Sequence, residues 1–175
     1  MIRINKATEM NLNDIMAIRM KMLKEVNDLN DNYEFGDSFK EDTENYIKTG
    51  NQTTYLAYDD GVVGCATICY YEVMPTYDHP SGKRAHIMNI FTQKEYRKQG
   101  LASTLLYMLI DDAKEKGVTE ITLDATEEGK KLYYQNGFIQ SNERMVLDLN
   151  KMLKQNIKRA EQTGCQTHGC GCGEC

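Results

Sequence analysis

The segment HIMNIFTQKEYRKQGLASTLL, residues 86–106, decides the fold of this 175-residue chain. It begins in an apolar strand at 85–92, passes through a basic turn, and continues into a helix with apolar periodicity at 101–116. The turn has the pattern R-x-x-G-x-A, from Arg97 to Ala102. The first N–H groups of a helix have no intrahelical acceptor, and the helix dipole adds partial positive charge there. The segment therefore predicts an anion site built mainly of main-chain donors and suited to a pyrophosphate.

Residue types in the turn support this interpretation. Gly100 allows the backbone to approach a ligand closely, Ala102 is small, and Arg97 and Lys98 add positive charge. The Walker pattern G-x-x-x-x-G-K-[ST] and the dinucleotide pattern G-x-G-x-x-G are both absent. Taken alone, R-x-x-G-x-A fits a basic turn that merely caps a helix equally well.

The remaining patterns predict an α/β (α+β) domain with a mixed central β-sheet flanked by helices, in the order β-α-α-β-β-β-α-β-α-β. A capping box from Ser38 to Glu41 is expected to start the second helix, and the dipeptide at 60–61 (Asp-Gly) to form a hairpin turn. We expect one domain over 1–149, a helix at 150–163 and a Cys-rich flexible tail at 164–175. The expected strands are 2–6, 53–58, 62–71, 85–92, 119–124 and one within 138–149; the expected helices are 11–28, 39–49, 101–116 and 128–136.

Composition narrows the class of protein. Hydrophobic residues make up 41% of the chain, enough for a substantial core. The 26 acidic residues exceed the 21 basic ones, and the net charge of -5 argues against nucleic acid as a partner. No apolar run approaches the roughly 18 residues that span a bilayer, and the first ten residues lack the apolar core of a signal peptide. We therefore expect a cytoplasmic protein with no membrane partner, and a homodimer stays open.

A second block, LDATEEGKKLYYQNGF at 123–138, ends in the pattern L-Y-x-x-x-G-F. With the segment at 86–106, and in this order, it resembles the GNAT acyltransferase superfamily over residues 2–149. The resemblance implies a GNAT-like fold and an acetyl-CoA-dependent N-acetyltransferase. Such an enzyme transfers the acetyl group to a primary amine by direct attack, without an enzyme nucleophile.

The resemblance also implies where acetyl-CoA binds. The pantetheine arm would lie between the strands at 85–92 and 119–124, where these strands separate. A main-chain N–H near Ile90 or Phe91 would hold the thioester oxygen and stabilise the oxyanion. The expected cofactor-binding residues are Asn89, Ile90, Phe91 and Thr92 on the strand, and Arg97, Lys98, Gln99, Gly100, Leu101, Ala102 and Ser103 in the turn.

The resemblance assigns Tyr133, at the L-Y position, as the general acid that protonates the departing CoA thiolate. From the helix pattern alone, a packed structural tyrosine is the alternative. The substrate amine must lose a proton before it attacks. Glu72 and His86, at the ends of neighbouring strands, are candidate bases, and a base acting through water is a third option. A solvated carboxylate and a packed histidine are the structural alternatives.

Charge near the second helix bears on the acceptor. Residues 25–44 contain eight acids and one base. In the resembling fold this region borders the acceptor side, so it would attract a cationic amine, although a solvated surface explains it equally well. Tyr33, Phe35 and Tyr77 are candidate apolar walls, and Arg19 is placed to oppose an acceptor carboxylate. Amino acid derivatives, polyamines, peptides and antibiotics all remain open as the small-molecule or peptide amine.

The tail carries a second hypothesis. Cys165, His168, Cys170, Cys172 and Cys175 would suit Zn(II), Cu(I) or an iron–sulfur cluster. Redox thiol chemistry and an inert tail are the alternatives. The alternative function is thus a non-catalytic metal- or redox-responsive sensor on the same scaffold. Two further cysteines, Cys65 and Cys69, are expected to be buried small residues in a strand.

Overall fold

The structure, a computed structural model, describes residues 1–141 and 145–149. The contacts of the chain group Met1–Phe138 into one compact unit, and the fold below is that of this unit. Two single-turn 3-10 helices, η1 (Glu9–Asn11) and η2 (Lys94–Tyr96), supplement the main elements. These elements are β1 (Arg3–Lys6), α1 (Leu12–Val26), α2 (Asp37–Thr49), β2 (Gln52–Tyr58), β3 (Val62–Glu72), β4 (Lys83–Thr92), α3 (Leu101–Glu115), β5 (Glu120–Leu123) and α4 (Lys130–Gln135).

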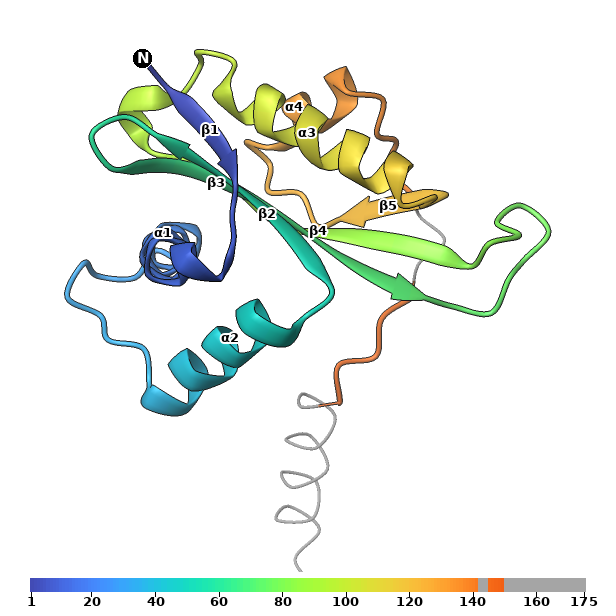
Figure 1. Ribbon diagram of the computed structural model, residues 1–175, viewed down its shortest axis with the longest axis horizontal. Helices are drawn as coiled ribbons and strands as arrows, with labels where there is room; N and C mark the ends of the chain where they lie inside the picture. Colours follow the sequence, from blue (N-terminus) through green and yellow to red (C-terminus); the bar gives the residue numbers. More distant parts are fainter. Residues whose placement is uncertain (142–144, 150–175) are drawn as a thin grey trace, which may run out of the picture. The chain divides into compact units, whose positions relative to one another are not determined.

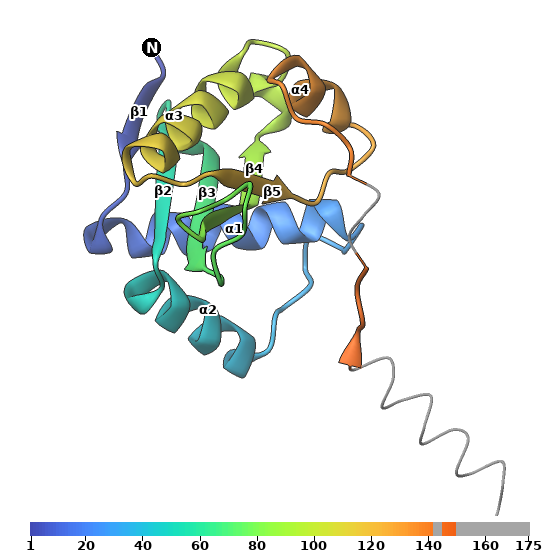
Figure 2. The same cartoon turned by 90° about the vertical axis from the view of Figure 1, so that its right-hand side faces the viewer.

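The five strands form one sheet in the order β1-β2-β3-β4-β5. The first four are antiparallel neighbours, whereas β4 and β5 run parallel, as their connection through α3 requires. Helices α1 and α2 lie on one face of the sheet, and α3 and α4 lie on the other (Figures 1 and 2). The predicted mixed sheet with flanking helices is therefore confirmed.

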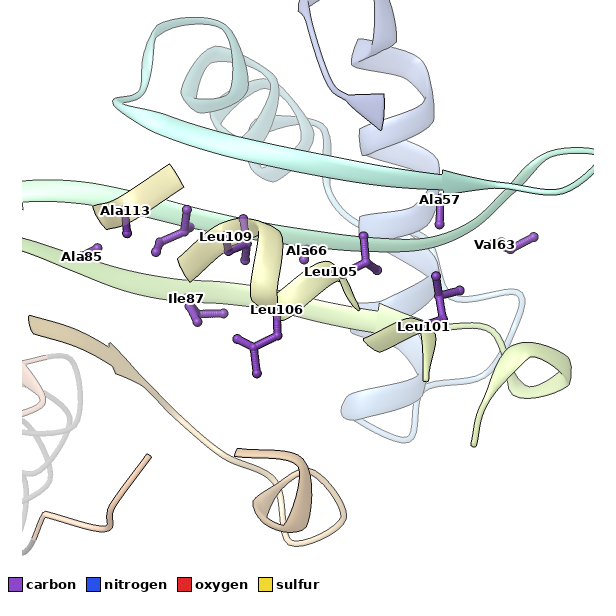
Figure 3. Close-up of a cluster of buried hydrophobic side chains, with 11 residues drawn as sticks. Ala57, Val63, Ala66, Ala85, Ile87, Leu101, Leu105, Leu106, Leu109 and Ala113 are labelled. Atoms are coloured by element: carbon purple, nitrogen blue, oxygen red, sulfur yellow. The ribbon is translucent and has the colours of Figure 1, made fainter. Parts of the chain in front are cut away.

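Each face of the sheet has its own hydrophobic core. On the α3 face, Leu105, Leu106 and Leu109 are fully buried and pack on small and aliphatic strand residues such as Ala66 and Ile87 (Figure 3). Burying a leucine side chain contributes about 2 kcal/mol, so this helix provides much of the stability. The other face buries Ile15, Ile18, Met22, Leu56, Cys65 and Phe91.

A buried carboxylate joins α3 to three strands. Asp112 is 7% exposed, and its two oxygens accept hydrogen bonds from the Lys6 ammonium at 2.5 Å and the Thr53 hydroxyl at 2.7 Å. The hydroxyls of Tyr70 and Tyr55 also donate to it, at 3.0 and 3.3 Å. These contacts satisfy a charged group that would otherwise be costly to bury. No sequence pattern pointed to this network.

Local turn signals had mixed outcomes. The hairpin turn is confirmed, since Asp60 and Gly61 both adopt positive φ, 52° and 143°. The capping box is wrong, because α2 begins at Asp37 and its N-cap is Gly36. The Gly36 carbonyl accepts from the Lys40 N–H at 3.1 Å, so the helix starts before Ser38.

The expected strand within 138–149 is not observed in the described part of that range, which is 138–141 and 145–149. Met145 and Leu147 are 96% and 71% exposed. Alternating apolar residues form a strand only where a sheet edge pairs with them, and the pattern does not identify that edge. The predicted helix at 150–163 and the tail at 164–175 lie outside the described residues. No helix found within 1–141 and 145–149 is long and apolar enough to cross a membrane.

Candidate active site

Strands β4 and β5 separate part-way along β4. They pair only over four residues of β4, from Arg84 to Ile87, whereas β3 pairs with β4 as far as Thr92. Figure 2 shows the two arrows pointing in different directions beyond their contact. From Met88 onward, the β4 edge that faces β5 has no strand partner within the described residues. Its main-chain N–H and C=O groups are therefore available to a ligand.

A β-bulge lies at the point of separation. Thr67 pairs with Asn89, and the next residue of β3, Ile68, pairs with Ile87, so Met88 is the extra residue on β4. An extra residue reverses the alternation of side chains along a strand. As a result, residues on either side of the bulge that are three apart point to the same face of the sheet.

His86 and Asn89 are such a pair, and both lie on the face covered by α1 and α2. Asn89 is buried, and its side-chain oxygen accepts a hydrogen bond from the Arg19 guanidinium of α1 at 2.7 Å. His86 is in register with Cys69, whose thiol neighbours the Tyr46 hydroxyl of α2. The bulge thus places an imidazole and an amide side by side on one polar surface.

The hydrogen bonds of His86 define its chemistry. Its Nδ1 lies 2.8 Å from the Thr122 hydroxyl oxygen on β5, and its Nε2 lies 3.8 Å from a carboxylate oxygen of Asp124. The Thr122 hydroxyl in turn lies 3.3 Å from the Ala85 carbonyl and donates to it. Because the Thr122 hydroxyl uses its hydrogen for the Ala85 carbonyl, it accepts a hydrogen bond from the Nδ1–H of His86. Nε2 of His86 therefore keeps a lone pair. It lies beside the Asp124 carboxylate, which would stabilise the protonated imidazole. Sequence reasoning named His86 but missed Thr122 and Asp124, because only the β4–β5 register pairs them.

Glu72 lies elsewhere. It is exposed at the end of β3 and in register with Lys83. Five residues separate it from Thr67, the partner of Asn89, which is about 17 Å along a strand. The structure therefore does not bring Glu72 to the place where β4 and β5 separate.

The basic turn has the geometry of a helix start. Gly100 is the N-cap of α3 with φ of 83°, and a Cβ built on it would meet nothing within 4 Å. The first helical hydrogen bond runs from the Thr104 N–H to the Gly100 carbonyl at 3.0 Å. The N–H groups of residues 101–103 precede that bond, as an anion site requires. Lys98, also at positive φ (59°), and Gln99 are exposed beside them.

Arg97 is engaged within the protein. Its Nε donates to the Thr92 carbonyl at 3.0 Å, its Nη2 pairs with Glu25 of α1, and its guanidinium lies 5.8 Å from the centre of the Phe91 ring. Arg97 therefore connects the turn to β4 and α1. Lys98 is the exposed cation of the turn, a division of roles that the sequence did not indicate.

Other expected cofactor residues contribute mainly their backbone. The side chains of Asn89, Phe91, Thr92 and Leu101 are buried, which leaves their main-chain groups as the contacts for a ligand. Ile90, Ala102 and Ser103 are half-buried.

Tyr133 and Tyr134 differ in environment. Tyr133 packs edge-on against Phe138, with ring centres 5.8 Å apart, and burial raises the pKa of its hydroxyl above the usual value. Tyr134 is 51% exposed. A phenol with a raised pKa keeps its proton at neutral pH, so Tyr133 is present there as a proton donor and not as a base.

The expected acceptor residues are only partly assembled. Tyr33 and Phe35 contact each other edge-on at 5.1 Å, whereas Tyr77 is 98% exposed. Among the acidic residues of 25–44, Glu25 forms an ion pair with Arg97 and not with a ligand. The tail residues proposed as metal ligands lie outside the described residues. Within 1–141 and 145–149 no group of three or more His, Cys, Asp or Glu side chains could hold a metal ion.

A family model described as the acetyltransferase (GNAT) family matches residues 20–138. The chain belongs to this family. Membership makes it an acyltransferase. No curated protein matches the chain.

Solved GNAT structures share the fold. A predicted acetyltransferase from Clostridium acetobutylicum, solved with acetyl-CoA, has a TM-score of 0.76 and 24% identity, covering 86% of this chain and 98% of its own. Glucosamine-6-phosphate N-acetyltransferase from Arabidopsis thaliana has a TM-score of 0.64 and 16% identity, covering 85% and 98%. Ribosomal-protein-alanine N-acetyltransferase from Brucella melitensis has a TM-score of 0.64 and 16% identity, covering 85% and 99%. Such low identities establish the fold alone.

Proposed function

We propose that this GNAT protein transfers the acetyl group of acetyl-CoA to a primary amine of a small molecule or peptide. One observation carries the proposal. The unpaired edge of β4 and the open N-terminus of α3 belong to one continuous segment of the chain, separated only by the basic turn. A thioester arm on the strand and a pyrophosphate on the helix start are the parts of acetyl-CoA that fit these two features.

In this proposal the main chain of residues 89–92 faces the pantetheine arm, and the N–H of Ile90 or Phe91 holds the thioester oxygen. The N–H groups of residues 101–103 hold the pyrophosphate, and Lys98 adds charge at the turn. Arg97 supports the turn through its contacts with Thr92 and Glu25.

The reaction follows from the groups present. The amine transfers a proton to Nε2 of His86, either directly or through a water, and its nitrogen attacks the carbonyl carbon of the thioester. The tetrahedral oxyanion accepts the N–H of the β4 main chain. The C–S bond then breaks, and the departing thiolate takes a proton from the Tyr133 hydroxyl. The Tyr133 phenolate takes up the proton that the nitrogen releases as the amide forms, directly or through water. Asp124 stabilises the imidazolium until its proton returns to solvent.

Replacing His86 with Gln should lower kcat for acetyl transfer about 10–100-fold, because Gln cannot accept the proton of the amine. Steady-state release of CoA measures the effect. His79→Gln is the matched control, since His79 is a half-buried histidine paired with Glu120 at 3.3 Å near the other end of β4. Equal losses in the two variants would exclude His86 as the base.

Calorimetric titration of acetyl-CoA into the reduced full-length protein tests the function itself. We expect one-to-one binding with a Kd on the order of 1–100 μM.

Gly100→Ala should weaken binding at least tenfold, because its Cβ projects into the open space over the helix start. Gly117→Ala, at the C-terminal end of the same helix with φ of 72°, is the control. Both variants should lose about 1 kcal/mol of stability, but Gly117→Ala should bind normally. Absence of binding by the wild-type protein would overturn the proposed function.

A further inference from the structure

Arg19 lies on the α1/α2 face of the sheet and has no acidic partner in the part of the chain that the structure describes. Its Nη1 donates to the neutral side-chain oxygen of Asn89 at 2.7 Å. Its Nε is buried and has no hydrogen-bond partner among the described residues. Two other arginines of limited exposure are neutralised, since Arg84 pairs with Glu120 and Arg97 pairs with Glu25. Within 1–141 and 145–149, no carboxylate forms an ion pair with Arg19.

The groups around Arg19 do not supply the missing negative charge. Burial, followed by the neighbouring Cys69 thiol, raises the pKa of Tyr46 to about 12. Burial likewise raises the pKa of Cys65 to about 12. Both groups are therefore neutral at physiological pH, and the Tyr46 hydroxyl is hydrogen-bonded to the Cys69 thiol. Burial also lowers the pKa of Arg19, which reflects the cost of keeping its charge in a partly desolvated place.

The position of this cation connects it to the reaction. Asn89, which Arg19 contacts, lies on β4 where that strand has left β5, and His86 lies just before the bulge on the same face. An acceptor that presents its amine to His86 would therefore lie beside Arg19. A planar guanidinium presents its N–H groups in a fork that matches the two oxygens of a carboxylate or a phosphate.

We propose that Arg19 binds the carboxylate of the acceptor, so that the substrate class is an amino acid with a free carboxylate. The inference rests on the proposed function, because it names the acceptor of that same site. A diamine or polyamine would leave Arg19 unpaired and place a second cation against it, which disfavours that class.

The test uses product-like probes, because they report on acceptor binding without turnover. A panel of N-acetyl-L-amino acids and the matching N-acetyl-L-amino acid amides is titrated into the full-length protein loaded with CoA. At least one acid should bind ten or more times tighter than its own amide. Arg19→Gln should weaken the binding of that acid at least tenfold and the binding of its amide less than twofold. Arg19→Lys should retain part of the preference, and Arg84→Gln, at the other end of β4, should leave it unchanged.

The outcomes separate three cases. If no acid binds tighter than its amide in the wild-type protein, the inference is overturned without any variant being needed. If Arg19→Gln weakens acid and amide equally, Arg19 acts only by holding Asn89, and the inference is also overturned. Acetyl-CoA titration of the wild-type protein tests the proposed function separately. If acetyl-CoA does not bind, the proposed function is rejected. If acetyl-CoA binds but no acid binds tighter than its amide, only the acceptor class is rejected.

Discussion

Replacing Asp112 with Ala should lower the free energy of unfolding by about 3 kcal/mol. The substitution removes the acceptor of four hydrogen bonds, those from Lys6, Thr53, Tyr55 and Tyr70. Thr53 is buried and Tyr70 is half-buried, and both would lose their partner, which costs about 1–3 kcal/mol for a buried group. Lys6 can still reach water because its side chain is 51% exposed, so the loss stays below the upper range for a broken buried ion pair.

The same site makes stability depend on pH. Burial alone would raise the pKa of Asp112, but the hydrogen bonds from Lys6, Thr53 and Tyr70 outweigh it and lower the pKa. A carboxyl group whose folded pKa lies below its unfolded value of about 3.9 stabilises the protein above that pH. The contribution is lost as the pH falls through the folded pKa. The difference between wild type and Asp112→Ala should therefore be full at pH 7 and shrink below about pH 4.

Urea unfolding followed by far-UV circular dichroism measures both effects. Asp111→Ala is the matched control, because the neighbouring Asp111 is 69% exposed and its ion pair is with the exposed Lys114. That control should change stability by less than about 0.5 kcal/mol. If the Ala variant does not fold, Asp112→Asn, which keeps an acceptor but loses the charge, should show a smaller loss. Similar stability of Asp111→Ala and Asp112→Ala would contradict the role of the network.

Tyr133→Phe should reduce kcat about 10²–10³-fold with little change in the Kd for acetyl-CoA. The phenol is the proposed proton donor to the departing thiolate, and removal of a general acid has an effect of this size. The ring itself keeps its packing against Phe138, so the fold should be retained. Steady-state CoA release and calorimetry measure the two quantities.

Tyr134→Phe is the control, because that neighbour is 51% exposed and should tolerate the change. The raised pKa of Tyr133 also predicts its pH behaviour. The protonated, active form persists below the raised pKa, so ionisation of this tyrosine should not reduce kcat until the pH exceeds about 10. Full activity of Tyr133→Phe would exclude the acid role.

Sequence patterns predicted much of the fold because their signals are local. Apolar periodicity placed α1 and α3 within two residues of their observed bounds. Asp60-Gly61 formed the expected turn because both residues tolerate positive φ. Gly100 marked the start of α3 for the same reason. The strand expected within 138–149 was not observed in the described part of that range, because alternation does not reveal which edge a strand pairs with.

The sequence by itself determined most of the elements, the order of those observed and the family, since turns and periodicity are encoded within a few residues. Only the tertiary structure decided which side chains meet. The bulge at Met88 placed His86 and Asn89 on one face, although simple alternation would separate them. Arg97 pairs with Glu25 and Asp112 pairs with Lys6, although these partners are 72 and 106 positions apart in the sequence. Register and long-range pairing depend on how whole elements pack, so no short pattern specifies them.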